Sequence, residues 1–305
     1  MYPKDGTVLV TGATGFIGKR LVKALVEEGY NARCMVRRHD VVLPEGATAV
    51  TGDLLVPAGL DPVFRGIDTA FYLVHSMGGG RAGFERRDRQ AAEYFTAAAE
   101  KAGVRRVIYL GGLGETGPNL SEHLASRLEV AQILMKGAFK TTFLRAPVII
   151  GAGGSSYEMI RHMVERLPMM ITPRWVSTRT QPIAVADVIG YLVGCLREER
   201  TAGETLDIGG PEILSYREMM ERFAAIEGKS VLIIPIPFLS LKLSSYWIGL
   251  ITPVKPSIAM PLIEGVRNEM VCRDQRIREL VPIKLTGFDE AIRIALGEEK
   301  DQHGK

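Results

Sequence analysis

Three glycines spaced three residues apart, Gly12, Gly15 and Gly18, stand between an apolar run and a helical pattern. The first glycine permits a tight turn, the second lets a phosphate approach the backbone, and the third lets helix and strand pack closely. The free N–H groups and the positive dipole end of the helix that starts at Phe16 suit a bound anion. This context predicts a dinucleotide-binding loop rather than a merely tight turn. The residues expected to line the ligand are Gly12, Thr14, Gly15, Phe16, Ile17 and Gly18.

Two arginines, Arg37 and Arg38, end the next strand-like run, and no acidic residue is in place there. An acidic residue at this position binds the ribose 2′-hydroxyl, whereas an arginine accommodates a 2′-phosphate. The alternative is a pair of solvated surface arginines. The pattern favours NADP over NAD.

Three further residues are candidates for cofactor contact. Asp53 follows the third strand-like run and can accept a hydrogen bond from the adenine amino group, or simply cap a turn. Val74 ends the fourth run and His75 follows it, and both are expected at the carboxyl edge of the sheet, where ligands bind. For His75, ordinary loop polarity is the alternative.

The elements that position these residues alternate between short apolar runs and helical patterns, which is typical of βαβ units and a parallel sheet. Strands are expected at 7–11, 32–36, 47–50, 69–74, 106–110 and 141–145. Helices are expected at 16–28, 84–101 and 121–136. This order predicts an α/β fold with a doubly wound parallel sheet, the Rossmann architecture, and a smaller C-terminal substrate-binding region.

The pattern loosens after Gly151, where prolines cluster and element lengths become irregular. The expected division is a dinucleotide-binding domain of residues 1–153, rejoined by 181–210, a substrate-binding region of 154–180 and 211–297, and a frayed polar tail of 298–305. Between Ser230 and Ile263 only Lys242 and Lys255 are charged, and five prolines interrupt the stretch. It is too broken to span a bilayer, so it either walls an apolar pocket or rests on a membrane surface.

The composition is that of a soluble globular enzyme, with 46% apolar and 24% charged residues in a chain of 305. The 38 basic residues against 35 acidic ones give a net charge of +3, too weak to argue for nucleic acid. The three cysteines show no metal-ligand spacing, so no metal site is expected. Their isolation, and a first strand at Thr7 that leaves no room for a signal peptide, predict a reduced, cytoplasmic protein.

These motifs resemble the short-chain dehydrogenase/reductase superfamily, in its extended and atypical branches and most closely its NmrA-like NAD(P)-binding proteins. The resemblance covers residues 5 to about 225. It rests on TGATGFIG at 11–18, GDL at 52–54, AGVRRVIYL at 102–110, LRAPVIIG at 144–151, QPIAVAD at 181–187 and DIGGP at 207–211. By this resemblance Leu54 joins Asp53 at the adenine.

The chain departs from the superfamily at the catalytic residues. The superfamily usually carries Tyr-x-x-x-Lys on the helix after the fifth strand, where this chain has His123 and Arg127. The two share one helix face, so His123 can act as a general acid and Arg127 can bind the cofactor ribose. A partly exposed histidine with no chemical role is the alternative. The family's catalytic serine falls on Gly111-Gly112-Leu113, which has no hydroxyl.

Three functions follow as hypotheses. The first is an NADP(H)-dependent oxidoreductase acting on a small apolar carbonyl or quinone-like substrate, with His123 and Arg127 as its catalytic residues. The second is a non-catalytic dinucleotide-binding sensor or assembly protein, because the Tyr, Lys and Ser set is lost. The third, a nucleotide-sugar epimerase or dehydratase, needs a polar sugar pocket that the apolar C-terminal half does not suggest. The substrate and the oligomeric state are not determined by the sequence.

Overall fold

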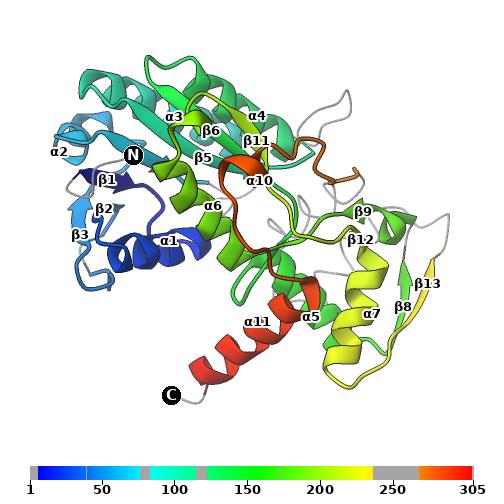
Figure 1. Cartoon of the computed structure of the whole chain (residues 1–305). Coiled ribbons are helices and arrows are strands. Elements are labelled where there is room, and N and C mark those ends of the chain that lie inside the picture. Colours follow the sequence, from blue (N-terminus) through cyan, green and yellow to red (C-terminus); the bar gives the residue numbers. More distant parts are fainter. Residues whose placement is uncertain are drawn as a thin grey trace.

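The computed structural model describes residues 6–38, 40–75, 83–114, 122–172, 174–235 and 268–303. A parallel sheet of seven strands forms its centre (Figure 1). The strands are β1 (Thr7–Val10), β2 (Asn31–Val36), β3 (Thr48–Thr51), β4 (Thr69–Tyr72), β5 (Arg106–Gly112), β6 (Lys140–Ala146) and β11 (Thr205–Asp207). Their order across the sheet is β3-β2-β1-β4-β5-β6-β11, and every neighbouring pair is parallel. The doubly wound fold is confirmed, and its strand order reverses between β1 and β4.

Helices cover both faces of this sheet (Figure 1). They are α1 (Phe16–Glu27), α2 (Asp61–Phe64), α3 (Phe84–Lys101), α4 (Glu122–Met135) and α6 (Val185–Arg197), with the short 3₁₀ turns η1 (Pro57–Gly59) and η3 (Glu199–Thr201). α1 buries Leu21, Val22 and Leu25, the three- and four-residue spacing of a helix with one apolar face. These side chains share one core with residues of α6, while α2, α3 and α4 pack into a second core on the opposite face.

The expected strands and helices of the sheet layer form within two residues of their expected ends. β4 ends at Tyr72, so Leu73 and Val74 lie beyond the strand, and His75 lies past it as expected. β11 pairs with β6 at the edge of the sheet, so the segment 181–210 contributes one strand to it.

A third core lies beside the sheet and is built mainly by α5 (Ser155–Arg166), α7 (Tyr216–Ile226) and α11 (Phe288–His303). Short strand pairs accompany these helices: β7 (Ile149–Ile150) with β10 (Ile183–Ala184), β9 (Arg179–Thr180) with β12 (Leu214–Ser215), and β8 (Met169–Thr172) with β13 (Leu232–Pro235). The turn η2 (Arg174–Ser177) and the helix α10 (Ile277–Leu280) complete the described elements. The exact domain boundaries remain a prediction.

The polar tail was expected to be frayed, but in the structure α11 continues through His303. Glu298 pairs with Arg20 of α1 at 2.6 Å, and Glu299 accepts hydrogen bonds from Arg161 and Tyr157 of α5 at 2.6 and 3.2 Å. Polar residues therefore hold this end of the helix against two other helices.

Only the beginning of the uncharged 230–263 stretch belongs to the described residues. Its strand β13 pairs in parallel with β8, and Leu232 and Ile234 lie beside Met169 and Ile171 on an exposed apolar face. Residues 236–263 lie outside the described residues. Among the helices that are described, none is long and apolar enough to cross a membrane.

Candidate active site

The glycine loop lies where β1, β4 and α1 meet. Gly12 adopts a φ of +67°, and a Cβ there would lie 2.6 Å from the carbonyl oxygen of Leu73. A Cβ at Gly18 would collide with the carbonyl oxygen of Gly12. At Gly15 a Cβ would meet only that same oxygen, at 3.2 Å. Gly12 and Gly18 are thus required by the turn and the packing, whereas Gly15 leaves the surface of the loop open to a ligand.

Thr11 joins the loop to the neighbouring strand at the point where the strand order reverses. Its hydroxyl donates to the carbonyl oxygen of Phe71 at 3.0 Å and accepts from the N–H of Leu73 at 3.2 Å. A threonine side chain therefore fixes the separation of β1 and β4 at the edge where a ligand enters.

The first turn of α1 suits an anion. Gly15 occupies the N-cap position, no side chain caps the helix, and its first turn holds no acidic residue. The N–H groups of a helix start carry a partial positive charge that a phosphate can neutralise. The residues present therefore fit a dinucleotide pyrophosphate.

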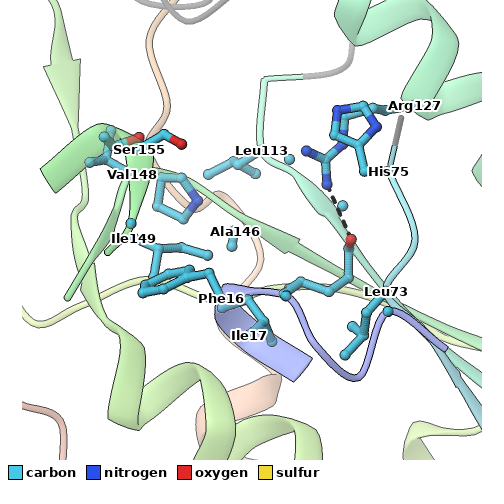
Figure 2. A pocket seen from close by; sticks show the side chains of 18 of the residues that line it. Phe16, Ile17, Leu73, His75, Leu113, Arg127, Ala146, Val148, Ile149 and Ser155 are labelled. Atoms are coloured by element: carbon cyan, nitrogen blue, oxygen red, sulfur yellow. Dashed lines mark hydrogen bonds between the residues drawn. The ribbon is translucent and has the colours of Figure 1, made fainter. Parts of the chain in front are cut away.

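A cavity of about 410 Å³ opens from this loop along the carboxyl ends of the strands (Figure 2). Of the predicted site residues, eight line it: Gly12, Gly15, Phe16, Ile17, Gly18, Val74, His75 and Arg127. The cavity continues between Leu113 and Val148 to residues of α5 and α7. One continuous space thus joins the glycine loop to the third core.

The other predicted cofactor residues lie away from this cavity. Thr14 is exposed in the loop, and Arg37 and Arg38 are exposed beyond the end of β2. Asp53 accepts a hydrogen bond from the N–H of Leu55 at 2.9 Å, the turn-capping alternative, while Leu54 is buried in the core of α2 and α3. The side chain of Leu54 therefore packs in the core and does not line the cavity.

His75 forms a buried pair that the sequence did not reveal. Its Nδ1 lies 3.0 Å from Oδ2 of Asp88 on α3, and the Asp88 side chain is only 4% exposed. Burial lowers the pKa of His75, the hydrogen bond with Asp88 opposes this effect, and the charge of Arg127 adds to it. Asp88 precedes Ala91, Ala92 and Phe95 at helical spacing, so it lies on the buried stripe of α3. This spacing could have predicted that Asp88 is buried, but the arginines around it made the segment look exposed.

Arg127 reaches from α4 to the end of β5. Its guanidinium donates to the carbonyl oxygen of Leu110 at 3.2 Å, as the dashed line in Figure 2 shows. Its own carbonyl oxygen accepts from the hydroxyl of Tyr109 at 3.3 Å. The guanidinium is therefore held at the cavity wall. His123 belongs to the first turn of α4, and its side chain lies outside the described residues.

At Gly111, one of the three residues on which the family's serine falls, aromatic packing leaves no room for a side chain. A Cβ at Gly111 would lie 2.5 Å from the ring of Phe143, which stacks on Tyr109 with ring centroids 5.0 Å apart. Tyr109 is buried as expected of a core residue. A hydroxyl side chain at Gly111 is thus incompatible with the present arrangement of β5 and β6.

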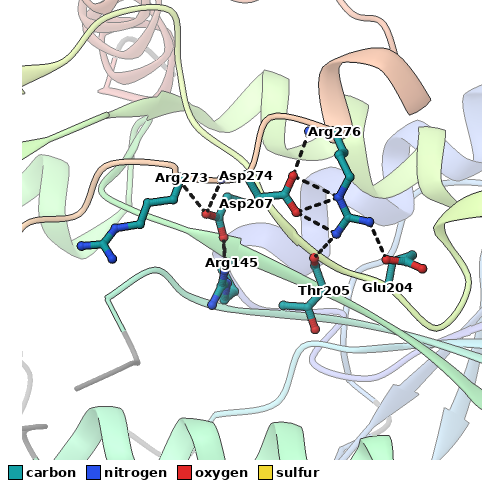
Figure 3. A network of polar contacts seen from close by, with 7 residues as sticks. All are labelled: Arg145, Glu204, Thr205, Asp207, Arg273, Asp274 and Arg276. Atoms are coloured by element: carbon teal, nitrogen blue, oxygen red, sulfur yellow. Dashed lines mark hydrogen bonds and ion pairs between the residues drawn. The ribbon is translucent and has the colours of Figure 1, made fainter. Parts of the chain in front are cut away.

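Met270 lines the cavity, and the segment that follows it contains Arg273 and Asp274, which belong to the polar network of Figure 3. Asp207 at the end of β11 accepts from Arg145 at 2.7 Å and from the N–H groups of Arg273 and Asp274 at 3.1 and 3.2 Å. Gln181 accepts from the N–H of Cys272 at 3.1 Å. Gln181 and Asp207, which belong to the motifs that resemble the family, therefore hold residues 272–274, close in the chain to Met270.

The comparisons with known proteins agree with this geometry. Residues 12–173 match the family described as NAD(P)H-binding. The chain is 28% identical to ceramide reductase of Caulobacter vibrioides (strain NA1000 / CB15N), over 76% of this chain and 74% of the relative. It is 24% identical to the photosystem II assembly factor Ycf39 of Cyanophora paradoxa, over 77% of this chain and 74% of the relative.

Among solved structures, the triphenylmethane reductase of Citrobacter sp. superposes with a TM-score of 0.77 at 18% identity, over 95% of this chain and 99% of that one. At this identity the likeness concerns the fold alone. The family match covers more than half of the chain, and the glycine loop and the doubly wound sheet agree with it. The chain belongs to the NAD(P)H-binding family.

Proposed function

We propose that this protein is an NAD(P)H-dependent reductase of a small apolar carbonyl or quinone-like compound. The observation that carries the proposal is the continuity of the cavity, which begins at the glycine loop and ends among Val148, Met159, Ile160 and Met270. A cofactor at one end and an apolar molecule at the other would lie next to each other in this one space. The two reductases among the similar proteins support the same class of reaction.

Several residues of this chain would hold the cofactor. The N–H groups at the start of α1 would bind the pyrophosphate, and Arg127 would bind the ribose hydroxyls beside the nicotinamide. Arg37 and Arg38 would bind a 2′-phosphate, so NADPH is the preferred reductant. When bound, the nicotinamide supplies a hydride, and the protein supplies binding, orientation and a proton.

His75 is one candidate for the proton donor. Its Nδ1 faces the carboxylate of Asp88, which orients the ring as carboxylates orient catalytic histidines in other enzymes. Burial lowers the pKa of His75, so its charged imidazole gives up a proton more readily than that of an exposed histidine. His75 lines the cavity, whereas the side chain of His123 lies outside the described residues, so both histidines stay candidates for the proton donor.

The test is steady-state oxidation of NADPH against a panel of quinones and apolar ketones. Replacing a general acid costs about 10²–10⁴-fold in rate, so His75→Ala should lose activity by that factor while binding NADPH normally. His123→Ala tests the earlier candidate under the same conditions. His162→Ala is the matched control, because His162 lies on α5 between Glu158 and Glu165 and does not line the cavity. Full activity in both His75→Ala and His123→Ala would remove both histidines from the mechanism.

A non-catalytic role as a dinucleotide sensor or assembly protein is the second candidate. Two observations favour it: the packing that excludes a serine at Gly111, and the similarity to a photosystem II assembly factor. Tight binding of NADPH by the wild type, with no oxidation by any compound of the panel, would favour this second function. The nucleotide-sugar epimerase hypothesis receives no support from the apolar wall of the cavity.

A further inference from the structure

The two-stranded sheet of β8 and β13 has an exposed apolar face, at the right-hand edge of Figure 1 and away from the central sheet. This β8–β13 face consists of four large side chains: Met169, Ile171, Leu232 and Ile234. Each is between 40% and 56% exposed, whereas the alternate residues Met170 and Ile233 are buried in the third core. A strand with one side on a core normally carries polar residues on the other side. Four adjacent apolar side chains there indicate a surface that meets an apolar partner.

The charges near this face are almost all of one sign. In the sequence, residues 166–186 and 228–263 contain three basic residues each and no acidic one. The glutamates just before these ranges, Glu165 and Glu227, are each bonded to a basic residue, at 2.8 and 2.9 Å. The electrostatic complement of such a region is an anionic surface.

Two of the basic residues lie at one end of the face. Arg166 precedes Met169 by three residues, and Lys229, the partner of Glu227, precedes Leu232 by three residues. Since β8 and β13 are parallel and Met169 lies opposite Leu232, Arg166 and Lys229 are at the same end of the sheet, and both are exposed. Apolar side chains beside basic ones suit a bilayer surface, where they meet acyl chains and anionic headgroups.

We propose that the β8–β13 face binds the surface of a lipid bilayer that contains anionic lipids. A protein partner would present charges of both signs, whereas the two stretches beside this face offer only basic residues. The sequence after β13 also contains Tyr246 and Trp247, residue types that are enriched where a membrane meets water. The inference is independent of the proposed function, because none of the four residues of the face lines the cavity.

The experiment is flotation of the full chain with vesicles of phosphatidylcholine alone, or of equal parts phosphatidylcholine and phosphatidylglycerol. The wild type should float with the anionic vesicles, and added salt should weaken this binding. Ile171→Thr with Leu232→Thr keeps strand-forming residues but removes apolar surface, so binding should weaken about tenfold. Val42→Thr with Ile294→Thr is the matched control, because these residues are 95% and 47% exposed away from the face.

The thermal midpoint, the NADPH affinity and the mass by light scattering are measured on the same samples. The threonine variant should match the wild type in all three, since its substituted residues are exposed and outside the cavity. The proposal is overturned if the wild type floats with neither vesicle, or if the control variant loses binding equally. Without flotation, a dimer that the threonine variant dissociates would assign the face to a second copy, and a lowered midpoint would assign it to another segment of the same chain. Flotation needs no substrate, so a failure of the proposed reductase activity would leave this inference intact.

Discussion

At the scale of single residues, Gly15 controls whether a phosphate can approach the loop. Its backbone is extended, with φ −76° and ψ 175°, so a β-branched residue can adopt it. In Gly15→Val the new Cβ meets one carbonyl oxygen at 3.2 Å, and its methyl groups occupy the space above the N–H groups of α1. We expect a folded protein that no longer binds NADPH, measured by cofactor fluorescence with circular dichroism on the same sample. Normal binding by this folded variant would show that the phosphate lies elsewhere.

Arg37 and Arg38 decide between the two cofactors. Both side chains are exposed. The Nε of Arg38 lies 4.0 Å from a carboxylate oxygen of Asp40, so Arg37 is the better residue for the test. Losing a charge-assisted contact to a 2′-phosphate costs about 1.5–3 kcal/mol, or roughly tenfold or more in affinity. Arg37→Ala should therefore weaken NADPH binding by that factor and leave NADH binding unchanged. Fluorescence titration with both cofactors tests this, and equal wild-type affinities for the two would reject the NADP assignment.

The His75–Asp88 pair predicts a pH dependence. Since burial lowers the pKa of His75, reduction that needs a charged imidazole should accelerate as the pH falls below the ordinary histidine value. Asp88 opposes the effect of burial, so Asp88→Asn should lower the pKa further and move the whole profile to more acidic pH. The measurement is kcat/KM for any panel substrate between pH 5 and about 9. A profile that Asp88→Asn leaves in place would remove His75 as the proton donor.

At the scale of elements, α7 depends on its capping box. Glu218 accepts hydrogen bonds from the N–H and the hydroxyl of Ser215 at 2.6 and 2.7 Å, and these bonds lower the pKa of Glu218. A carboxylate with a lowered pKa in the folded state stabilises the protein above its unfolded pKa, and this contribution is lost as the pH falls through the folded value. Ser215→Ala should cost about 1 kcal/mol at pH 7 and less under acidic conditions.

Thermal unfolding of wild type and Ser215→Ala at pH 7 and pH 4, followed by circular dichroism, measures this difference. Ser155 on α5 offers a control, because α5 starts after Gly154 without a side-chain cap and Ser155 follows that position. A destabilisation by Ser215→Ala that is the same at both pH values would contradict the role of Glu218.

At the scale of the whole molecule, α11 connects the glycine-loop helix to the third core. Arg20 of α1 contacts both Glu298 and the carbonyl oxygen of Ala152, at 2.6 and 3.0 Å, while Glu299 contacts α5. Truncation after Gly297 removes both glutamates and should lower the thermal midpoint by roughly 2–6 °C. Truncation after His303 is the control and should change nothing. Equal midpoints of the two truncated proteins would show that these ion pairs do not stabilise the fold.

Local patterns in the sequence predicted much of this architecture. The apolar runs and the glycine spacing depend on neighbours along the chain, so they located the strands in the sequence and the loop after the first strand. The pairing of His75 with Asp88 depends on a contact between separate segments, which no local pattern encodes. Leu54 shows the same limit, since a motif located it beside the ligand whereas packing placed its side chain in the core.

The packing of Gly111 beneath Phe143 also restricts which side chains the end of β5 can carry. A serine introduced at Gly111 alone would place its Cβ against the Phe143 ring, which is stacked on Tyr109. Replacing Phe143 by a smaller residue first would make room but leave a cavity in the core of α3 and α4. Each single step is thus destabilising, and only the double substitution is compatible with a full core. Gly111 and Phe143 can therefore change only together if the core at this strand end is to stay filled.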